Sequence, residues 1–244
     1  MFDWTKISSN PIDPAVFDAW KKFYDQEVVR FNIFHEKHRD ERILDICQVT
    51  NNGNIKLLDI GFAEHGVEFA KKPDWFHRKL RSFNNKIFGL DINEKAVREI
   101  SALTKYDNLI VGDATNPSLL VEGGEFNVIH AGDVVEHLSN IGGFLEFCKN
   151  NLTKGGRVII TTPNPCAPDA YKTWRKEGII ANMEHTCWIT PTNMNELCRR
   201  TNLKFSESHY SMNKRKTLIR RIKQNFIFKH KDTLFGEFIY VLTN

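Results

Sequence analysis

The chain has 244 residues, enough for one substantial α/β domain, and its 41% hydrophobic and 26% charged residues are ordinary for a globular protein. It contains no run of about 18 apolar residues, so the sequence predicts no membrane-spanning helix. We also expect no signal peptide, because residues 1–10 lack a basic and then apolar layout. The five cysteines form no CxxC pair, which argues against a zinc site or a disulfide frame and predicts a cytoplasmic protein.

The first 54 residues predict a helical N-terminal extension. Asp13 can cap a helix whose first position is Pro14, and apolar residues recur at helical spacing up to Phe31. A second helix is expected over residues 36–50. We therefore predict that residues 1–54 form a cap on a core domain of residues 55–244.

From residue 55 onward, short apolar runs alternate with helical patterns. Strands are expected at residues 56–60, 86–91, 108–111, 126–130, 157–161 and 235–242. Asn93 and Thr190 each begin a predicted helix. This alternation predicts an α/β fold, namely a Rossmann-like, mostly parallel sheet of seven strands with helices on both faces. An insertion at residues 73–85 is read as an elongated helix or a substrate-side flap, with a plain surface helix as the favoured alternative.

Polar and small residues follow three consecutive predicted strands. Asp59 precedes the loop of Gly61, Phe62 and Ala63, where small residues allow a ligand to approach the backbone. Asp91 ends the next strand, where a carboxylate can accept hydrogen bonds from both hydroxyls of a ribose, and Asp113 ends the third. Each feature alone could be a tight turn or a helix cap. Together they predict an adenosine-binding edge of the sheet.

Six segments carry a resemblance to a known family. They are LLDIGFAEHG (57–66), GLDINEKAV (89–97), VGDAT (111–115), FNVIHAGDVVEHL (126–138), LTKGGRVIITTPNP (152–165) and EHTCWITPTNMNELCRRTNL (184–203). Between residues 56 and 203 the sequence thereby resembles the class I S-adenosylmethionine-dependent methyltransferases. Ala63 and His65 stand where the family usually has its second and third glycines, which makes the loop less open.

The resemblance implies S-adenosylmethionine as the cofactor and assigns residues to its parts. Asp59 and the loop around Gly61 are expected at its amino-acid moiety, and Gly132 beside the methionine chain. The assignments for the adenosine are Asp91 on the ribose, Ile92 against the adenine face, and Asp113 with Ala114 at the adenine rim.

An NAD-dependent oxidoreductase is the alternative with the same fold. The spacing Gly61-x-Ala63-x-x-Gly66, with an acidic residue at the next strand end, fits a dinucleotide loop nearly as well. Asp59 argues against this alternative, because its carboxylate would repel a pyrophosphate and attract the cofactor ammonium. We therefore favour the methyltransferase.

Four residues are candidates for catalysis. Methyl transfer to a hydroxyl requires a base or a metal ion that lowers the proton affinity of the acceptor. Asp133, Glu136 and His137 follow the strand at 126–130 on one side of a helical turn, and His185 is expected on the same face.

The Asp-x-x-Glu-His spacing resembles the Glu-x-x-Glu-His segment of ubiquinone-biosynthesis O-methyltransferases and of small-RNA 2′-O-methyltransferases. In those families the segment is associated with a divalent metal, and the RNA enzymes have a further histidine where His185 is expected. Asp133 shortens the first ligand by one methylene. The alternatives are that His137 or His185 acts as a general base, or that the group only braces the helix.

The partner of the enzyme is predicted from residues 214–231, which are rich in lysine and arginine and contain no acidic residue. Such a basic amphipathic segment suits the inner face of an anionic membrane, RNA phosphates or plain solvent. The preferred acceptor is the hydroxyl of a sugar, another glycan or a small molecule in surface-polysaccharide biosynthesis, because the EHTCWITP segment (184–191) resembles such methyltransferases. An RNA 2′-O-methyltransferase and a non-catalytic cofactor-binding regulator are the alternatives.

Overall fold

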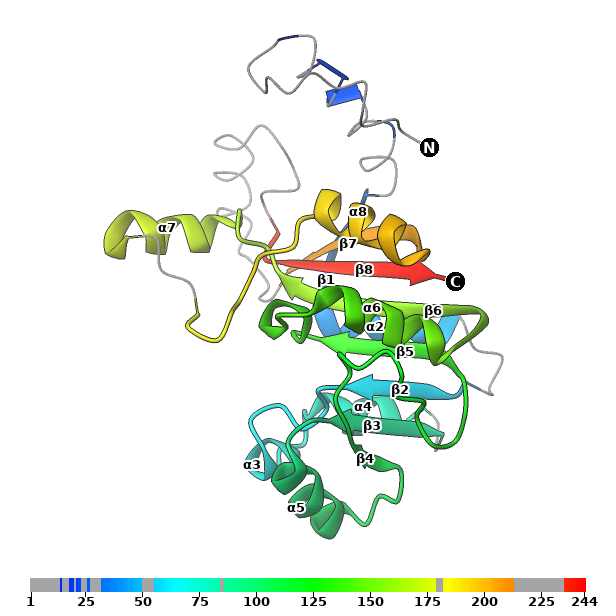
Figure 1. Ribbon diagram of the computed structural model, residues 1–244. Coiled ribbons are helices and arrows are strands. Elements are labelled where there is room, and N and C mark those ends of the chain that lie inside the picture. The colour runs from blue at the N-terminus through cyan, green and yellow to red at the C-terminus, as the bar shows by residue number, and fades with distance from the viewer. Residues whose placement is uncertain are drawn as a thin grey trace.

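The computed structural model describes residues 32–49, 55–83, 86–178, 182–212 and 235–244, together with six single positions between residues 14 and 26. The helix expected after Asp13 and the basic stretch 214–231 therefore lie outside the continuously described parts of the chain. Within them the chain forms one sheet with helices on both faces (Figure 1).

The sheet has eight strands in the order β1-β7-β8-β6-β5-β2-β3-β4. The strands are β1 (Asn32–His38), β2 (Leu57–Ile60), β3 (Ile87–Asp91), β4 (Leu109–Val111), β5 (Phe126–Gly132), β6 (Leu152–Pro163), β7 (Lys204–Met212) and β8 (Glu237–Thr243). Only β8 runs antiparallel to its two neighbours, β6 and β7. The predicted Rossmann-like, mostly parallel sheet is thus confirmed, with one strand more than expected.

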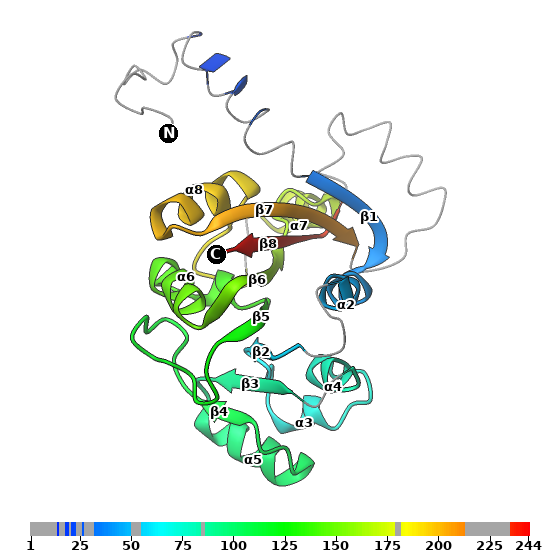
Figure 2. The ribbon, with the colours of Figure 1, turned by 90° about the vertical axis from the view of Figure 1, so that its right-hand side faces the viewer.

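Helices cover the two faces of the sheet (Figure 2). They are α2 (Arg39–Val49), α3 (Val67–Ala70), α4 (Phe76–Arg81), α5 (Glu94–Thr104), α6 (Ile141–Asn150), α7 (Pro168–Glu177) and α8 (Pro191–Thr201), with a 3-10 turn η3 (Val135–His137). Helices α6 and α8 lie on one face and α2 and α4 on the other, while α7 projects from the body (Figure 1). Among the described residues, none of these helices is long and apolar enough to cross a membrane.

The alternation of side chains along β2 and β5 separates two apolar layers. Leu58 and Ile129 point to the face where Phe144 of α6 is buried. Leu57 and Val128 point to the face of α2 and α4. Because successive side chains of a strand point to opposite faces, both layers arise from one continuous apolar run in each strand. Asp59 and His130 continue the second layer, toward α2 and α4, at the carboxyl ends of their strands.

The N-terminal region differs from its prediction. The helix expected over 36–50 begins at Arg39, and Asn32–His38 is a strand instead. The cause is tertiary: β1 pairs in parallel with the open edge of β7, and the Phe34 ring stacks on Tyr210 with 4.7 Å between ring centroids. Such an edge offers a row of backbone hydrogen-bonding groups that outweighs a local helical preference.

The insertion at residues 73–85 is neither a flap nor a plain surface helix. Trp75 and Leu80 are buried, and the Trp75 indole nitrogen donates a hydrogen bond to the Phe62 carbonyl oxygen at 3.0 Å. Phe76 packs against the layer of α2, and His77 is buried below the same loop. The aromatic residues of the insertion therefore support the loop that follows β2.

Gly143 allows α6 to lie against the turn that follows β4. An ideal Cβ at this position would meet the Thr115 carbonyl oxygen at 2.5 Å, a distance that side chains do not tolerate. At the neighbouring Gly142 the nearest atom to such a Cβ is the Asn140 Oδ1 at 4.0 Å. The close approach fixes the 113–115 turn beside the predicted adenine site.

Two alanine substitutions in α6 should therefore change stability in opposite directions. We expect Gly143→Ala to lower the free energy of unfolding by about 1–3 kcal/mol, because the added methyl group clashes with backbone. Gly142→Ala should raise it by about 0.5–1 kcal/mol, because alanine loses less conformational entropy in a helix. Urea unfolding monitored by circular dichroism measures both. Equal effects would show that the packing of α6 on the turn is loose.

Candidate functional site

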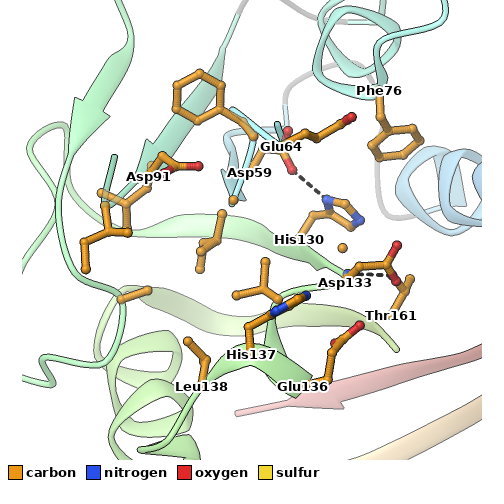
Figure 3. Close-up of a pocket in the computed structure, with 18 of the residues that line it drawn as sticks. Asp59, Glu64, Phe76, Asp91, His130, Asp133, Glu136, His137, Leu138 and Thr161 are labelled. Carbon is orange, nitrogen blue, oxygen red and sulfur yellow. Dashed lines mark hydrogen bonds and ion pairs between the residues drawn. The ribbon is translucent and has the colours of Figure 1, made fainter. Parts of the chain in front are cut away.

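One cavity of about 670 Å³ lies at the carboxyl ends of the parallel strands. It is lined by every residue predicted for the site except Ala63, namely Asp59, Gly61, Phe62, Asp91, Ile92, Asp113, Ala114, Gly132, Asp133, Glu136, His137 and His185. Figure 3 shows how side chains from β2, β3 and β5 meet around it. Residues that are distant in sequence are thus gathered at one edge of the sheet.

The loop after β2 packs closely against the segment that follows β5. Gly61 has φ +75°, and a Cβ there would lie 2.5 Å from Cγ2 of Val134. Ala63 takes part through its backbone: its N–H donates to the Asp91 carboxylate at 3.2 Å, and the Asn93 N–H donates to the same group at 2.8 Å. Burial raises the pKa of Asp91, the charge of Asp59 adds to this effect, and the backbone hydrogen bonds oppose it.

Two neighbouring loops form the end of the cavity that the sequence predicts to bind adenine. The Ile92 side chain, after β3, is 70% exposed although it is large and apolar. After β4, the Asp113 carboxylate accepts hydrogen bonds from the Thr115 backbone N–H at 2.8 Å and from its hydroxyl at 2.7 Å. Ala114 is almost fully buried beneath this turn. The arrangement offers an apolar surface next to a polar rim, as a purine ring requires.

Asp59 lies at the floor of the cavity and is bound by two histidines that sequence reasoning missed. The His130 Nδ1 donates to one carboxylate oxygen at 2.6 Å, and the His77 Nδ1 donates to the other at 2.8 Å. Burial opposes the ionisation of Asp59, but the hydrogen bonds from His130 and His77 outweigh it and hold its pKa below the ordinary value. A histidine inside the apolar run of β5 was the available signal for His130, whereas nothing in the sequence indicated His77.

Arg39 is a second residue that the sequence did not reveal. Among the described residues that line the cavity, it is the only lysine or arginine. Its guanidinium donates to the Asp133 carboxylate and, at 3.4 Å, to Asp40. Burial opposes the charge of Arg39, but Asp133 and Glu237 outweigh it and raise its pKa further, so it is always cationic.

Asp133 is therefore separated from the other three predicted catalytic residues. It takes the left-handed backbone conformation with φ +52°, and its carboxylate turns toward Arg39. The Thr161 hydroxyl also donates to this carboxylate, at 3.3 Å (Figure 3). As the structure stands, Asp133 is engaged by Arg39 and Thr161 instead of joining the histidines.

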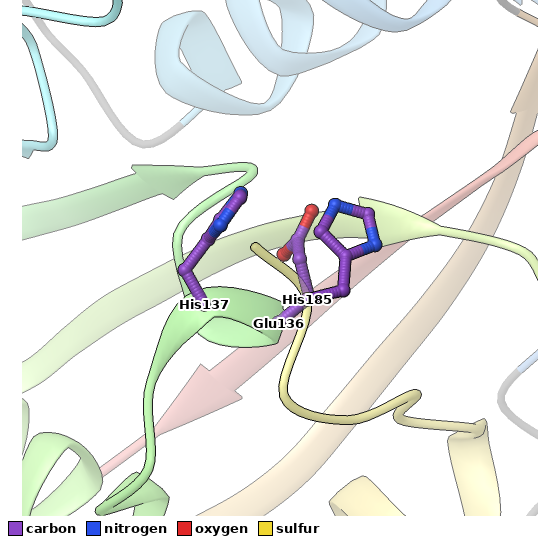
Figure 4. Close-up of side chains that lie close together, drawn as sticks. All are labelled: Glu136, His137 and His185. Carbon is purple, nitrogen blue, oxygen red and sulfur yellow. The ribbon is translucent and has the colours of Figure 1, made fainter. Parts of the chain in front are cut away.

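Glu136, His137 and His185 form a compact cluster (Figure 4). One ligand atom from each lies within 4.8 Å of the other two. Both carboxylate oxygens of Glu136 are buried, and within the described part of the chain neither has a hydrogen-bond partner of regular geometry. The His137 Nδ1 donates to the Glu184 carbonyl oxygen at 3.2 Å, which leaves its Nε2 lone pair free for a ligand. One carboxylate and two imidazoles are a donor set that suits several divalent metals, so these residues fit the predicted ion.

The chain after β6 holds His185 in this cluster. The Thr186 N–H donates to the Glu136 carbonyl oxygen at 2.8 Å, and its hydroxyl donates to the Leu138 carbonyl oxygen at 2.8 Å. Burial lowers the pKa of His185 and the neighbouring His137 lowers it further, so the His185 ring is neutral near pH 7. A neutral imidazole can bind a metal ion or accept a proton.

The raised pKa of the Glu136 carboxyl group predicts that the stability of the protein depends on pH. Burial, with the charges of Asp133 and Glu237, raises its pKa from an ordinary 4.5 to about 7. Between these values the folded state retains a proton that the unfolded state releases, so stability is lost as the pH rises toward 7. In chelator, Glu136→Gln should therefore gain roughly 2–3 kcal/mol relative to wild type between pH 5 and pH 8.

Denaturant unfolding at several pH values measures this difference. Glu146→Gln, an exposed change on α6, is the matched control and should follow the wild-type curve. If Glu136→Gln also follows it, the Glu136 carboxylate is hydrated and is not the buried, unpaired group described above.

Two solved structures with the same fold are described as methyltransferases. One from Archaeoglobus fulgidus, described as a SAM-dependent methyltransferase, has a TM-score of 0.57 at 16% identity and covers 84% of this chain and 92% of its own. Another from Clostridium acetobutylicum has a TM-score of 0.56 at 11% identity and covers 93% of this chain and 98% of its own. At these identities the likeness shows the shared fold.

A curated relative, the ubiquinone biosynthesis O-methyltransferase of Caulobacter sp. (strain K31), is 35% identical over 113 residues, 45% of this chain and 41% of its own length. That of Caulobacter vibrioides is 29% identical over the same shares. The chain thus spans about two fifths of the length of the curated relatives it matches. A family model described as a methyltransferase domain matches residues 34–208. Because this match covers more than half of the chain, the protein belongs to the methyltransferase domain family, as the class I resemblance predicted.

Proposed function

We propose that the protein is an S-adenosylmethionine-dependent O-methyltransferase that acts on a hydroxyl group of a small acceptor. The observation that carries this proposal is the cluster of Glu136, His137 and His185 beside the cofactor crevice. An amine acceptor is already nucleophilic when it is unprotonated, whereas a hydroxyl needs help to lose its proton. The cluster supplies that help.

Different residues of the crevice bind different parts of the cofactor in this proposal. The proposal assigns Asp91 to the ribose hydroxyls, Ile92 to the adenine face, and the turn of Asp113 and Ala114 to the adenine rim. The Gly61 loop approaches the methionine chain. Arg39 pairs with the carboxylate of the cofactor, because it is the one permanent cation among the described lining residues. The cofactor supplies the methyl group that is transferred.

The acceptor hydroxyl lies at the other end of the cavity in this proposal. Glu136, His137 and His185 would hold a divalent ion, which would lower the proton affinity of a bound hydroxyl. Neutral His185 can instead accept the hydroxyl proton directly if no ion is bound. In either case, His137 is oriented by the Glu184 carbonyl oxygen, and Glu136 is placed by its own buried turn.

Two classes of acceptor have support. A sugar hydroxyl in surface-polysaccharide biosynthesis is the acceptor favoured by the sequence. The names of the curated relatives favour a hydroxyl on a ubiquinone precursor. Membrane or RNA contact through residues 214–231 stays a prediction, because that stretch lies outside the described residues. Incubation with labelled cofactor and a panel of sugar nucleotides and catechols, followed by mass spectrometry, distinguishes the two classes.

Cofactor binding should depend on Asp91. We expect S-adenosylhomocysteine to raise the melting temperature of the protein, and NAD to leave it unchanged. Asp91→Ala should weaken S-adenosylhomocysteine binding about tenfold or more in calorimetry, because hydrogen bonds to a charged group contribute roughly 1.5–3 kcal/mol. Asp107→Ala, at the amino end of β4, is the control. Stabilisation by NAD alone would favour the oxidoreductase.

Turnover should depend on a divalent ion and on His185. Chelator should abolish methyl transfer, and manganese or magnesium should restore it. His185→Ala should lower turnover at least tenfold while S-adenosylhomocysteine binding stays unchanged, because His185 lies at the acceptor end. Full activity in chelator would instead make His185 or His137 a general base. Full activity of His137→Ala and of His185→Ala would place catalysis elsewhere.

A further inference from the structure

His130 has a buried nitrogen that none of the roles above uses. Its side chain is 3% exposed, and its Nδ1 is taken up by Asp59. Its Nε2 has no hydrogen-bond partner among the residues that the structure describes. A buried polar atom without a partner costs on the order of 1–3 kcal/mol, so such an atom at the edge of a ligand cavity calls for a ligand.

The ring that carries the unpartnered nitrogen belongs to the lining of the cavity. His130 lines the cavity, whereas His77, the other imidazole on Asp59, does not. A Cβ at Gly132 would lie 3.2 Å from the His130 Nε2 and 3.6 Å from the Thr161 hydroxyl, so the imidazole reaches over the last residue of β5. Figure 3 shows the ring between Asp59 and Asp133. Gly132 thus leaves open the space through which Nε2 meets a ligand.

The hydrogen bond to Asp59 determines which ring nitrogen of His130 carries the proton and which one can accept a hydrogen bond. An ionised carboxylate only accepts, so the proton of the His130 ring lies on Nδ1. In the neutral ring the Nε2 then carries a lone pair, and the negative charge of Asp59 strengthens it as an acceptor. The natural ligand for such an atom is a cationic N–H group.

The order of the strands places the amino-acid end of the cofactor near this atom. Adenine and ribose are assigned to β4 and β3, and the loop of β2 comes next, so the chain of the cofactor runs toward β5. Three strand spacings amount to about 14 Å, comparable to an adenosine with an extended methionine chain. Asp59 itself offers its oxygens to two imidazoles, and Asp133 is paired with Arg39.

We propose that the His130 Nε2, braced by Asp59, accepts a hydrogen bond from the α-ammonium group of the bound cofactor. This inference rests on the proposed function. The family resemblance implies that Asp59 itself lies at the amino-acid moiety of the cofactor. In this proposal, Asp59 instead acts on the ammonium group through His130. Arg39 and His130 then receive the carboxylate and the ammonium of the same amino-acid group.

The test compares two ligands and two matched variants by calorimetry. The ligands are S-adenosylhomocysteine and its analogue in which hydrogen replaces the α-amino group. His130→Asn places an amide near the former Nδ1 and can still donate to Asp59, but it lacks Nε2. His77→Asn makes the same change on the other side of Asp59, away from the cavity.

The wild-type protein should bind S-adenosylhomocysteine at least tenfold more tightly than the deaminated analogue. His130→Asn should reduce this ratio to near one by weakening only the amino-bearing ligand. His77→Asn should keep the wild-type ratio. The proposal is overturned if His130→Asn keeps the ratio, or if both variants lower it equally, since a shared loss would mean that the imidazoles only support Asp59.

A second variant and a measurement on the wild-type protein test the proposal even if His130→Asn fails to fold. His130→Gln places an amide oxygen near the former Nε2 and should restore part of the ratio. In the wild-type protein, the ¹⁵N resonance of the His130 Nε2 should shift with S-adenosylhomocysteine and not with the analogue; equal shifts overturn the proposal. Absence of any S-adenosylhomocysteine binding would instead contradict the cofactor assignment itself.

Discussion

Strands β2 and β5 are neighbours in the sheet, although the chain leaves β2 toward β3 on one side and β5 toward β6 on the other. Where the strand order reverses in this way, the loops after two adjacent parallel strands diverge and leave a crevice at their carboxyl ends. Every feature of the site depends on this divergence. It separates the Gly61 loop from the turn at Val135–His137, and it leaves Asp59 and His130 as paired residues at the bottom.

Among the described residues that line the crevice, carboxylates outnumber permanent cations. Carboxylates from β2, β3, β4 and β5 line it, and Arg39 is the only permanent cation among the described lining residues. Like charges raise one another's pKa, as the effect of Asp59 on Asp91 shows. An anionic dinucleotide would meet this excess of negative charge unfavourably, whereas a ligand with a sulfonium and an ammonium group would be attracted. The electrostatics thus favour the same cofactor as the family.

The sequence predicted those parts of the structure that local patterns determine. Apolar runs located the strands beside the cofactor, and Asn93 and Thr190 cap their helices as expected, each accepting a hydrogen bond from the backbone. It could not predict that Asn32–His38 pairs with β7, because the partner edge lies about 175 residues away. The partners of Asp59 and Asp133 were equally hidden. His77 contacts Asp59 and Arg39 contacts Asp133, both from helices on the same face of the sheet. The spacing of residues along the sequence does not indicate such contacts.

The two halves of the site differ in how they are assembled. The half assigned to the cofactor consists of loops that continue directly from β2, β3 and β4, so its geometry follows from the sheet. The half proposed for the acceptor includes His185, which belongs to no helix or strand. Its segment is held by hydrogen bonds from Thr186 to the Glu136 carbonyl oxygen and by the Tyr240 hydroxyl, which donates to the Ile189 carbonyl oxygen at 2.7 Å. These hydrogen bonds join the segment that carries His185 to the turn after β5 and to β8, instead of to the loops after β2, β3 and β4. Under the proposed function, changes in the sequence around residues 182–189 would therefore alter the acceptor site without disturbing the loops assigned to the cofactor, as expected of a fold that serves many functions.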